Sequence, residues 1–306
     1  MIVLVSPGQG AQKPGFLAPW LDLPGVADRL GALSEAAQVD LVRHGTESDA
    51  DTIRDTAIAQ PLLVAAGIVA GEALADGRSD IADAMAGHSV GEVTTAALSG
   101  VLSAEDAMRL VAVRANAMAE AAAAEPTSMA AVVGGDRAEV LAAIERHDLA
   151  PANLNSPAQV VAAGAADAVT ALAADAPARA RVIPLQVAGA FHTAYMASAR
   201  TRLEEFAPQL TPADPVVPLV SNAGGRVVTS GREYLDLLVG QVSSPVDWAA
   251  CMETFRDRGI TGMIELAPAG TLTGLAKREL KGIGLVNLNT PADLDAARTL
   301  LTGQEN

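Results

Sequence analysis

A serine lies between two glycines in the segment Gly87-His88-Ser89-Val90-Gly91, after a short apolar stretch and before an alanine-rich one. This is the G-x-S-x-G pattern of a nucleophile elbow, a sharp strand-to-helix turn that lifts a serine hydroxyl out of a sheet. A side chain at either glycine would crowd such a turn. The pattern predicts nucleophilic chemistry at the serine. The alternative is a glycine-rich turn with an incidental serine.

A serine nucleophile needs a general base within hydrogen-bond reach. The chain offers four histidines: His44, His88, His147 and His192. His88 adjoins Ser89 and should point away from it, His147 ends an amphipathic helix, and His44 lies in a polar stretch. His192 follows a predicted strand and precedes a helix, in the kind of loop where α/β active sites collect. We therefore expect His192 to be the base, oriented by a backbone carbonyl because no carboxylate stands out for that task.

Gln9 stands between two glycines directly after the first predicted strand, in the segment Pro-Gly-Gln-Gly-Ala-Gln at residues 7–12. The segment lacks the third glycine of a dinucleotide-binding loop and the Gly-Lys-Ser/Thr of a phosphate-binding loop. Backbone N–H groups exposed at a strand end would suit an oxyanion site. An ordinary strand-to-helix turn is the alternative.

Arg114 lies on the apolar face of a predicted helix, where its neighbours are Leu110, Val111, Ala117 and Met118. A buried guanidinium is costly unless it is paired. Its partner is expected to be a carboxylate, either within the chain or on a ligand. Close to an acyl-transfer serine, a ligand carboxylate gains weight.

Strand-like segments alternate with helical ones, which predicts an α/β fold with a mostly parallel sheet. Strands are expected at residues 2–6, 81–86, 216–221, 262–266 and 285–288, and helices at 59–74, 92–98, 104–124, 193–206, 234–239, 248–258 and from 271. The helix at 59–74 is expected to open at Gln60-Pro61.

Residues 126–188 have a different pattern, with a strand, a helix, two strands, a helix and a strand. These elements are expected at 128–134, 137–147, 152–155, 159–164, 166–174 and 180–187. The order β-α-β-β-α-β is that of a ferredoxin-like unit. The sequence thus predicts a catalytic core of residues 1–125 and 189–306 with a small subdomain, 126–188, inserted into it.

Composition narrows the class of protein. Half of the 306 residues are hydrophobic, which allows a large core, and the net charge of -15 argues against nucleic acid or anionic membranes as partners. No run of 18 apolar residues is present, so no membrane span is expected. The single cysteine, Cys251, excludes an internal disulfide and a cysteine-based metal site. We expect a cytoplasmic, monomeric enzyme without a metal or a cofactor.

These motifs together resemble the malonyl-CoA:acyl carrier protein transacylase family, from about residue 2 to residue 295. The resemblance rests on segments 7–12, 87–92 and 189–192, on Arg114 at 25 residues after Ser89, and on segments 60–61, 153–157, 239–246 and 265–275.

The resemblance implies a hydrolase-like α/β core with a ferredoxin-like insertion, and it assigns roles to single residues. Ser89 would be the nucleophile and His192 the base, oriented by the main-chain carbonyl of Gln241. Arg114 would hold the malonyl carboxylate. The N–H groups of Gln9 and Val90 would form the oxyanion hole. The substrate pocket would include Gln60, Asn155 and Phe191, the last being the family's usual mark of malonyl over methylmalonyl specificity.

The implied reaction is a ping-pong transfer of malonyl from malonyl-CoA, through a malonyl-serine ester, to the phosphopantetheine thiol of acyl carrier protein. It would supply fatty acid or polyketide synthesis. A serine hydrolase or thioesterase on the same elbow is the alternative, although it would leave Arg114 without a role. A non-enzymatic docking subunit is a further alternative, and the intact set of Ser89, His192 and Arg114 argues against it.

Acyl carrier proteins are acidic, so docking on an acidic chain would need a local basic patch. Lys277, Arg278 and Lys281 form the densest basic cluster. A solvated helix face is the alternative reading of these three residues.

Overall fold

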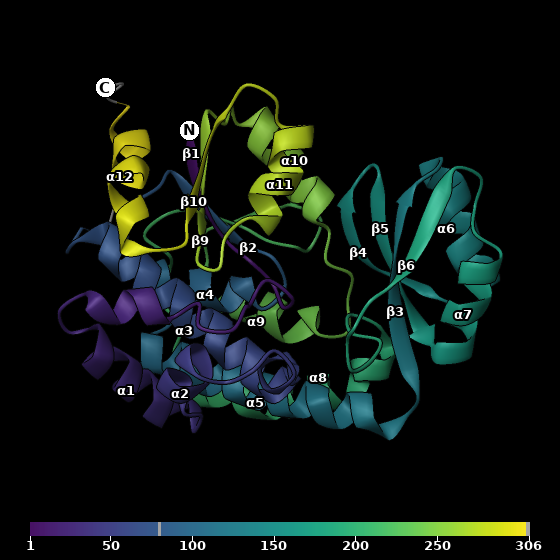
Figure 1. The fold of residues 1–306 in the computed structure, drawn as a ribbon, viewed down its shortest axis with the longest axis horizontal. Coiled ribbons are helices and arrows are strands. Elements are labelled where there is room, and N and C mark those ends of the chain that lie inside the picture. Colours follow the sequence, from purple (N-terminus) through teal and green to yellow (C-terminus); the bar gives the residue numbers. More distant parts are fainter. Residues whose placement is uncertain (79–80, 304–306) are drawn as a thin grey trace.

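The computed structural model describes residues 1–78 and 81–303, and two sheets organise this part of the chain (Figure 1). The larger sheet has six strands in the order β10-β9-β1-β2-β7-β8. They are β1 (Ile2–Ser6), β2 (Ala84–Gly87), β7 (Leu219–Val220), β8 (Val227–Val228), β9 (Gly262–Leu266) and β10 (Gly284–Leu288). All neighbours pair in parallel except β7 and β8. The predicted α/β class with a mostly parallel sheet is confirmed.

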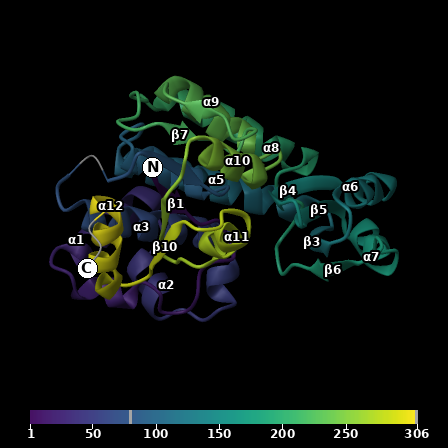
Figure 2. The ribbon, with the colours of Figure 1, turned by 90° about the horizontal axis from the view of Figure 1, so that it is seen from above.

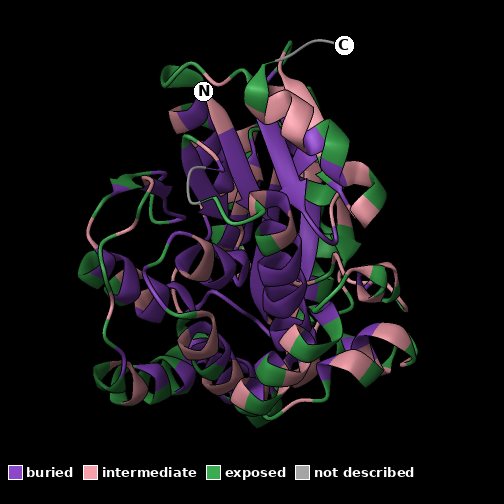
Figure 3. Ribbon diagram, turned by 90° about the vertical axis from the view of Figure 1, so that its left-hand side faces the viewer, coloured by how far each residue is buried: buried purple, intermediate pink, exposed green. Residues whose placement is uncertain are grey.

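The central strands of this sheet are buried on both faces, as parallel strands usually are (Figure 3). Successive side chains of β1 point to opposite faces, so Leu4 packs on one side and Val3 and Val5 on the other. The Leu4 side is covered by α1 (Val26–Ala37), α3 (Thr56–Ala75), α4 (Gly91–Leu98), α5 (Ala104–Ala124) and α12 (Leu294–Thr302). The opposite side is covered by α10 (Trp248–Asp257) and α11 (Thr271–Glu279).

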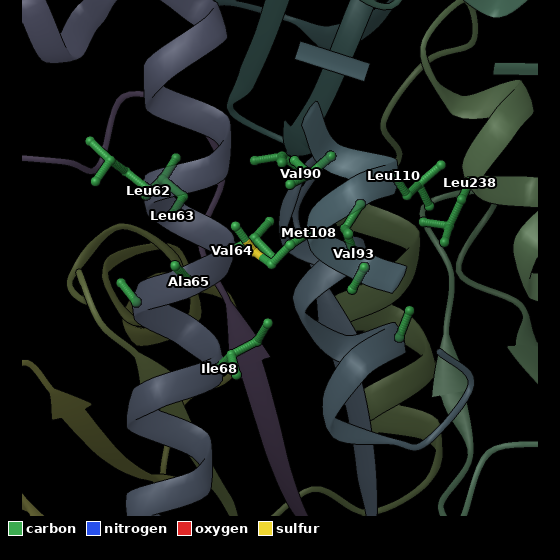
Figure 4. Close-up of a cluster of buried hydrophobic side chains, with 14 of the residues drawn as sticks. Leu62, Leu63, Val64, Ala65, Ile68, Val90, Val93, Met108, Leu110 and Leu238 are labelled. Atoms are coloured by element: carbon green, nitrogen blue, oxygen red, sulfur yellow. The ribbon is translucent and has the colours of Figure 1, made fainter. Parts of the chain in front are cut away.

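Helix α3 is the apolar helix at the centre of the larger core (Figure 4). By length and composition it could cross a membrane, which the sequence did not lead us to expect. However, 78% of its most apolar window is buried inside the fold, as in the core helix of a globular domain. It begins at Thr56 rather than at Gln60-Pro61, because the Asp55 side chain accepts the Ala57 N–H and caps the helix. Pro61 therefore lies inside the helix.

The smaller sheet is antiparallel, with the order β4-β5-β3-β6. Its strands are β3 (Thr127–Gly134), β4 (Ala150–Ser156), β5 (Gln159–Ala165) and β6 (Ala180–Pro184), and its helices are α6 (Arg137–Arg146) and α7 (Ala166–Ala174). The helices cover one face through a separate apolar core, on the side away from the larger unit (Figure 2). On the other face, Met129 and Val161 pack into the core of the larger unit. The chain order of these six elements is the one expected from sequence.

Backbone pairing joins the smaller sheet to the larger unit. The Leu154 N–H donates to the Val246 carbonyl at 2.8 Å, and the Val246 N–H donates to the Ala152 carbonyl at 2.9 Å. Val246 lies just before α10, so β4 is attached at the edge of the larger unit (Figure 1).

Several predicted boundaries were wrong. The strand expected at 216–221 is reduced to Leu219–Val220, because Pro215 and Pro218 interrupt the extended segment. Strand β6 ends at Pro184 rather than at residue 187. Helix α9 (Gly231–Gln241) starts earlier than expected because Ser230 caps it, and α8 (Ala197–Phe206) follows a short turn of 3-10 helix.

Among the α-helices and strands of residues 1–78 and 81–303, four were not predicted: α1, α2 (Leu41–Thr46), β8 and α12. The helix at Thr271 is consequently not the last one. In α1, the buried residues Leu30, Leu33 and Ala37 follow helical spacing. This apolar face could therefore have been predicted from the sequence.

Candidate active site

Ser89 occupies a sharp turn between β2 and α4, with a φ of 53° that a residue with a side chain rarely adopts. The glycines on either side are required by close backbone contacts. A Cβ on Gly87 would overlap the backbone of Gly91, and a Cβ on Gly91 would overlap the carbonyl oxygen of Ser6. The sequence therefore folds here into a strained elbow that presents the Ser89 hydroxyl at the carboxyl edge of the larger sheet.

His192 lies beside this hydroxyl. Its Nε2 is 2.7 Å from the Ser89 Oγ, and its Nδ1 is 2.8 Å from the carbonyl oxygen of Gln241. A carbonyl only accepts, so Nδ1 carries the proton and Nε2 is free to accept one from the serine. Burial, and then the charge of Arg114, lower the pKa of His192 to about 3. The imidazole is consequently neutral at pH 7 and able to act as a base.

Arg114 is buried on α5, directly beneath the serine. Its Nη2 donates to the Ser89 Oγ at 3.2 Å and to the Gln241 Oε1 at 2.9 Å, and its Nη1 donates to the Gln60 Oε1 at 2.6 Å. Its Nε has no hydrogen-bond partner among the described residues. Burial lowers the pKa of Arg114 to about 10, and the charge of Glu92 acts in the opposite direction. The guanidinium therefore stays charged at neutral pH.

Within residues 1–78 and 81–303, no carboxylate forms an ion pair with Arg114. Its partners in this part of the chain are neutral amides and a hydroxyl. An internal carboxylate partner, one of the two possibilities that the sequence left open, is thus absent among these residues. A buried cation held only by neutral groups suits an incoming anion, because its charge is not already matched.

Two further buried residues, which the sequence did not single out, hold the elbow from behind. Asn222 accepts the Ser89 N–H at 2.8 Å and donates to the Gly87 carbonyl at 2.7 Å. The Glu92 carboxylate accepts the Asn222 N–H at 2.9 Å and a hydrogen bond from the Gln241 side-chain amide. Burial raises the pKa of Glu92 to about 7. This network fixes both the serine backbone and the Gln241 amide that faces Arg114.

The sequence positions of Glu92 and Asn222 could have identified both as candidate site residues. Glu92 comes directly after the elbow motif, and Asn222 follows β7 at the carboxyl edge where α/β sites gather.

A cavity of about 460 Å³ opens above Ser89 and His192. It is lined by most of the predicted site residues, namely Gln9, Gln60, Ser89, Asn155, Phe191 and His192, whereas Val90, Arg114 and Gln241 lie outside its lining. Its apolar wall comes from α5, the smaller sheet and the segment after β6, through Met118, Met129, Val161, Leu185 and Val187. Arg278 of α11 stands at its rim. A cavity of this size is typical of a small-molecule binding site.

The loop after β1 presses against the elbow. A Cβ on Gly8 would lie 2.8 Å from the His88 Nδ1, so only glycine allows this approach. Within the described part of the chain, the backbone N–H groups of Gln9 and Val90 donate to no protein acceptor. They stand on the two segments that this approach brings together, and unused donors in such a place suit a developing negative charge.

The remaining histidines serve other contacts. The His88 Nε2 is 2.9 Å from the Asn155 Oδ1, His44 bonds Ser48, and His147 pairs with Asp175. Of the four histidines, only His192 contacts Ser89. Among residues 1–78 and 81–303, no group of three or more metal-ligating side chains is found.

Comparison with known proteins yields consistent relatives over the full length. Residues 3–298 match the family model described as the acyl transferase domain. A malonyl CoA-acyl carrier protein transacylase of Mycolicibacterium smegmatis is 50% identical over 285 residues, which cover 92% of this chain and 98% of that protein.

Solved structures agree with this match. The crystal structure of MCAT from Mycobacterium tuberculosis is similar with a TM-score of 0.95 and 49% identity, covering 97% of this chain and 99% of that one. A chain from the structure of a type II PKS acyl-carrier protein in complex with its malonyl-transacylase is similar with a TM-score of 0.90 and 28% identity. The match covers 99% of this chain and 99% of that one.

Proposed function

This chain belongs to the acyl transferase domain family, and on that premise we propose that it transfers the malonyl group from malonyl-CoA to acyl carrier protein. One observation carries the proposal: an imidazole and a guanidinium meet at the Ser89 Oγ. The His192 Nε2 lies 2.7 Å from it and the Arg114 Nη2 lies 3.2 Å from it. A nucleophile, a neutral base and a buried cation for an acyl carboxylate are thus assembled around one atom.

In the first half-reaction, the Ser89 Oγ attacks the thioester carbonyl carbon while the His192 Nε2 takes the hydroxyl proton. The tetrahedral intermediate collapses, the carbon–sulfur bond breaks, and the coenzyme A thiolate takes the proton from His192. The product is a malonyl ester on Ser89. The Gln241 carbonyl keeps the imidazole in the required tautomer throughout.

In the second half-reaction, the phosphopantetheine thiol of acyl carrier protein gives its proton to His192 and attacks the ester carbonyl carbon. The carbon–oxygen bond to Ser89 breaks, and the serine oxygen recovers the proton from His192. The malonyl thioester of the carrier leaves, and the enzyme is ready for another cycle. The transferred group supplies fatty acid or polyketide synthesis.

The backbone N–H groups of Gln9 and Val90 bind the oxyanion of both tetrahedral intermediates in this proposal, each contributing about 3–4 kcal/mol. Arg114 binds the free carboxylate with two parallel N–H donors, a geometry that lysine lacks. Gln60 holds the guanidinium from the side, and Phe191 and Asn155 border the acyl pocket. The unused donors of Gln9 and Val90 and the unmatched charge of Arg114 support these roles.

Acyl carrier protein is proposed to dock over α11. Lys277 and Arg278 are exposed in the last turn of this helix, Lys281 is exposed two residues after its end, and Arg278 also lines the cavity. An acidic partner on this helix would bring its phosphopantetheine arm to the opening above Ser89.

We also assign residues 1–125 and 189–306 to a hydrolase-like core, whose last residues, 304–306, lie outside the described part. Residues 126–188 are assigned to a ferredoxin-like subdomain. The parallel sheet with its elbow supports the first assignment, and the strand order β4-β5-β3-β6 supports the second. A monomeric state and a cytoplasmic location remain predictions.

Incubation with radiolabelled malonyl-CoA, without carrier protein, tests the function. A stable label on Ser89, released by added carrier protein as a malonyl thioester, is the expected result. Steady release of free malonate would instead identify a serine hydrolase. Absence of label from a folded enzyme would leave only a docking role.

A further inference from the structure

The loop that carries Gln9 is fastened to one short segment, residues 53–56, by two glutamine side chains. The Gln12 Nε2 donates to the Ile53 carbonyl at 3.1 Å, and the Gln12 Oε1 accepts the Gly10 N–H at 2.8 Å. The Gln9 Nε2 donates to the Thr56 Oγ1 at 3.2 Å. The loop is thus tied to the start of α3 at two points.

The bond to Thr56 ends a chain of hydrogen bonds that begins at Arg114. The Arg114 Nη1 donates to the Gln60 Oε1 at 2.6 Å, and the Gln60 Nε2 donates to the Gln9 Oε1 at 3.3 Å. A guanidinium only donates, so it fixes the orientation of the Gln60 amide and, through it, that of the Gln9 amide. The Gln9 Nε2 must therefore find an acceptor, and the Thr56 hydroxyl is that acceptor.

Gln9 has conformationally free glycine neighbours, although Gly8 abuts His88 and the Gly10 N–H bonds the Gln12 side chain. It stands between Gly8 and Gly10, and Gly10 has a φ of 104°, in a region that glycine adopts freely. The hydrogen bond from the Gln9 side chain to Thr56 therefore restrains the orientation of the Gln9 backbone. Thr56 itself is rigid, since it is 2% exposed and is the first residue of α3.

We propose that Thr56 is a positioning residue, which holds the Gln9 side chain so that the Gln9 backbone N–H faces the oxyanion. The inference rests on the proposed function, because it assumes that Gln9 is an oxyanion donor. Thr56 touches no reacting atom, and it acts only through Gln9.

The main test is Thr56→Val, which keeps the shape of the side chain and removes the acceptor. The kcat for malonyl transfer should fall about 10- to 100-fold, because removal of a whole oxyanion donor costs about 10²–10³-fold and displacement costs less. The KM for malonyl-CoA should stay within about twofold of the wild-type value, since Arg114 and the pocket are unchanged. Thr56→Ser retains the hydroxyl and should restore most of the lost kcat.

Thr94→Val is the matched control. Thr94 is also a fully buried threonine, but its Oγ1 has no hydrogen-bond partner within residues 1–78 and 81–303. The same substitution there should leave kcat within about twofold of wild type. A loss of kcat in both valine variants would indicate a general packing effect and would overturn the proposal.

A double-mutant cycle with Gln9→Ala tests whether Thr56 acts through Gln9. Once Gln9 has no amide, Thr56→Val should cost little further kcat, whereas independent effects would multiply and would contradict the proposal. Unchanged kcat in Thr56→Val, or a rise in KM alone, would also overturn it. If that variant does not fold, Thr56→Ala removes the same acceptor with less bulk and carries the same expectations.

Acylation of the wild-type enzyme separates this inference from the proposed function. Wild-type protein without a malonyl ester on Ser89 would refute the function and, with it, the role of Thr56. Normal wild-type acylation together with full activity of Thr56→Val would refute only the role of Thr56.

Discussion

The buried groups around Ser89 and the exposed basic groups near the opening of the cavity differ in how the fold holds them. The catalytic floor, defined as Ser89, His192 and Arg114, is buried and linked by hydrogen bonds among its own members. The basic rim, defined as Lys277, Arg278 and Lys281, is exposed. None of the rim residues forms an ion pair within residues 1–78 and 81–303.

This difference follows from what each region must do. In the proposed function, groups on the floor act on developing charge without water, so they have to be in place before the reaction begins. In the same proposal, groups on the rim meet a partner that arrives and leaves in every cycle, and water solvates them in its absence. Substitutions on the floor should therefore affect chemistry and substrate choice strongly, whereas substitutions on the rim should affect only encounter with a partner, and weakly.

Replacement of the nucleophile should have the largest effect. Ser89→Ala removes the atom that forms the ester, so kcat should fall by at least about 10⁴-fold, as in other serine enzymes that lose their nucleophile. Mass spectrometry after incubation with malonyl-CoA should find no covalent adduct, while circular dichroism should show an unchanged fold. A malonyl adduct that persists in the variant would place the nucleophile elsewhere, and the buried floor would then not be the catalytic region.

Arg114→Ala should change which acyl group is transferred. The malonyl carboxylate would be left buried and unpaired, a loss of about 3–5 kcal/mol, or roughly a hundred- to few-thousand-fold in kcat/KM. Acetyl-CoA has no such carboxylate, so its transfer should survive or improve. The measurement is the ratio of the two kcat/KM values.

The control for this prediction is Arg109→Ala, because Arg109 lies on the same helix but is exposed and pairs with Asp106. It should leave the acyl preference unchanged. Equal losses of kcat/KM with both substrates in a folded Arg114→Ala variant would assign the guanidinium a structural role. It would then not select the acyl group.

Burial of the floor should also affect how the free energy of unfolding depends on pH. The folded pKa of His192 is lowered to about 3 from an ordinary value of 6.5. Between these values the unfolded chain binds a proton that the folded chain does not, so stability falls as pH drops below 6.5. At pH 5 the loss is about 2 kcal/mol, or roughly 30-fold in the unfolding equilibrium.

His192→Gln removes this titration, and urea unfolding at pH 7.5 and pH 5 measures it. The wild type should lose about 2 kcal/mol more than the variant on acidification. Glu92 titrates in both proteins and cancels in the difference. Parallel curves for wild type and His192→Gln would show that the imidazole is hydrated, contrary to a buried floor.

The rim should give the smallest effect. Reversal of two exposed charges, Lys277→Glu with Lys281→Glu, should raise the KM for carrier protein about 5- to 10-fold at low salt. The KM for malonyl-CoA and the rate of serine acylation should not change. Arg146→Glu on α6, at the far side of the smaller sheet, is the control. Equal effects on both substrates would mean that the rim does not distinguish the partners.

The local parts of this site could be read from sequence, because each is fixed by its own neighbours. Steric demand at Gly87 and Gly91 dictates the elbow within five residues, and the position of His192 after a strand follows from the alternation of elements. The parallel sheet and the six elements of residues 126–188 were predictable for the same reason.

Contacts across the chain could not be read in this way. The Glu92 carboxylate meets the Asn222 N–H 130 residues away, and nothing in the local pattern of either residue encodes that distance. The neutral partners of Arg114 were likewise hidden, because an arginine on an apolar face has the same local pattern whether it faces a carboxylate or an amide. Short elements such as β8 lacked enough residues to show a period.

The backbone pairing of β4 with Val246 bears on how the width of the cavity can change. Val246 lies five residues after Gln241, whose carbonyl accepts the hydrogen bond of the His192 Nδ1, so β4 is bonded to the chain segment that supports the imidazole. An outward movement of β4 would therefore strain that support. We expect an enlarged acyl range to come from shortening side chains that line the cavity, such as Phe191, rather than from movement of β4.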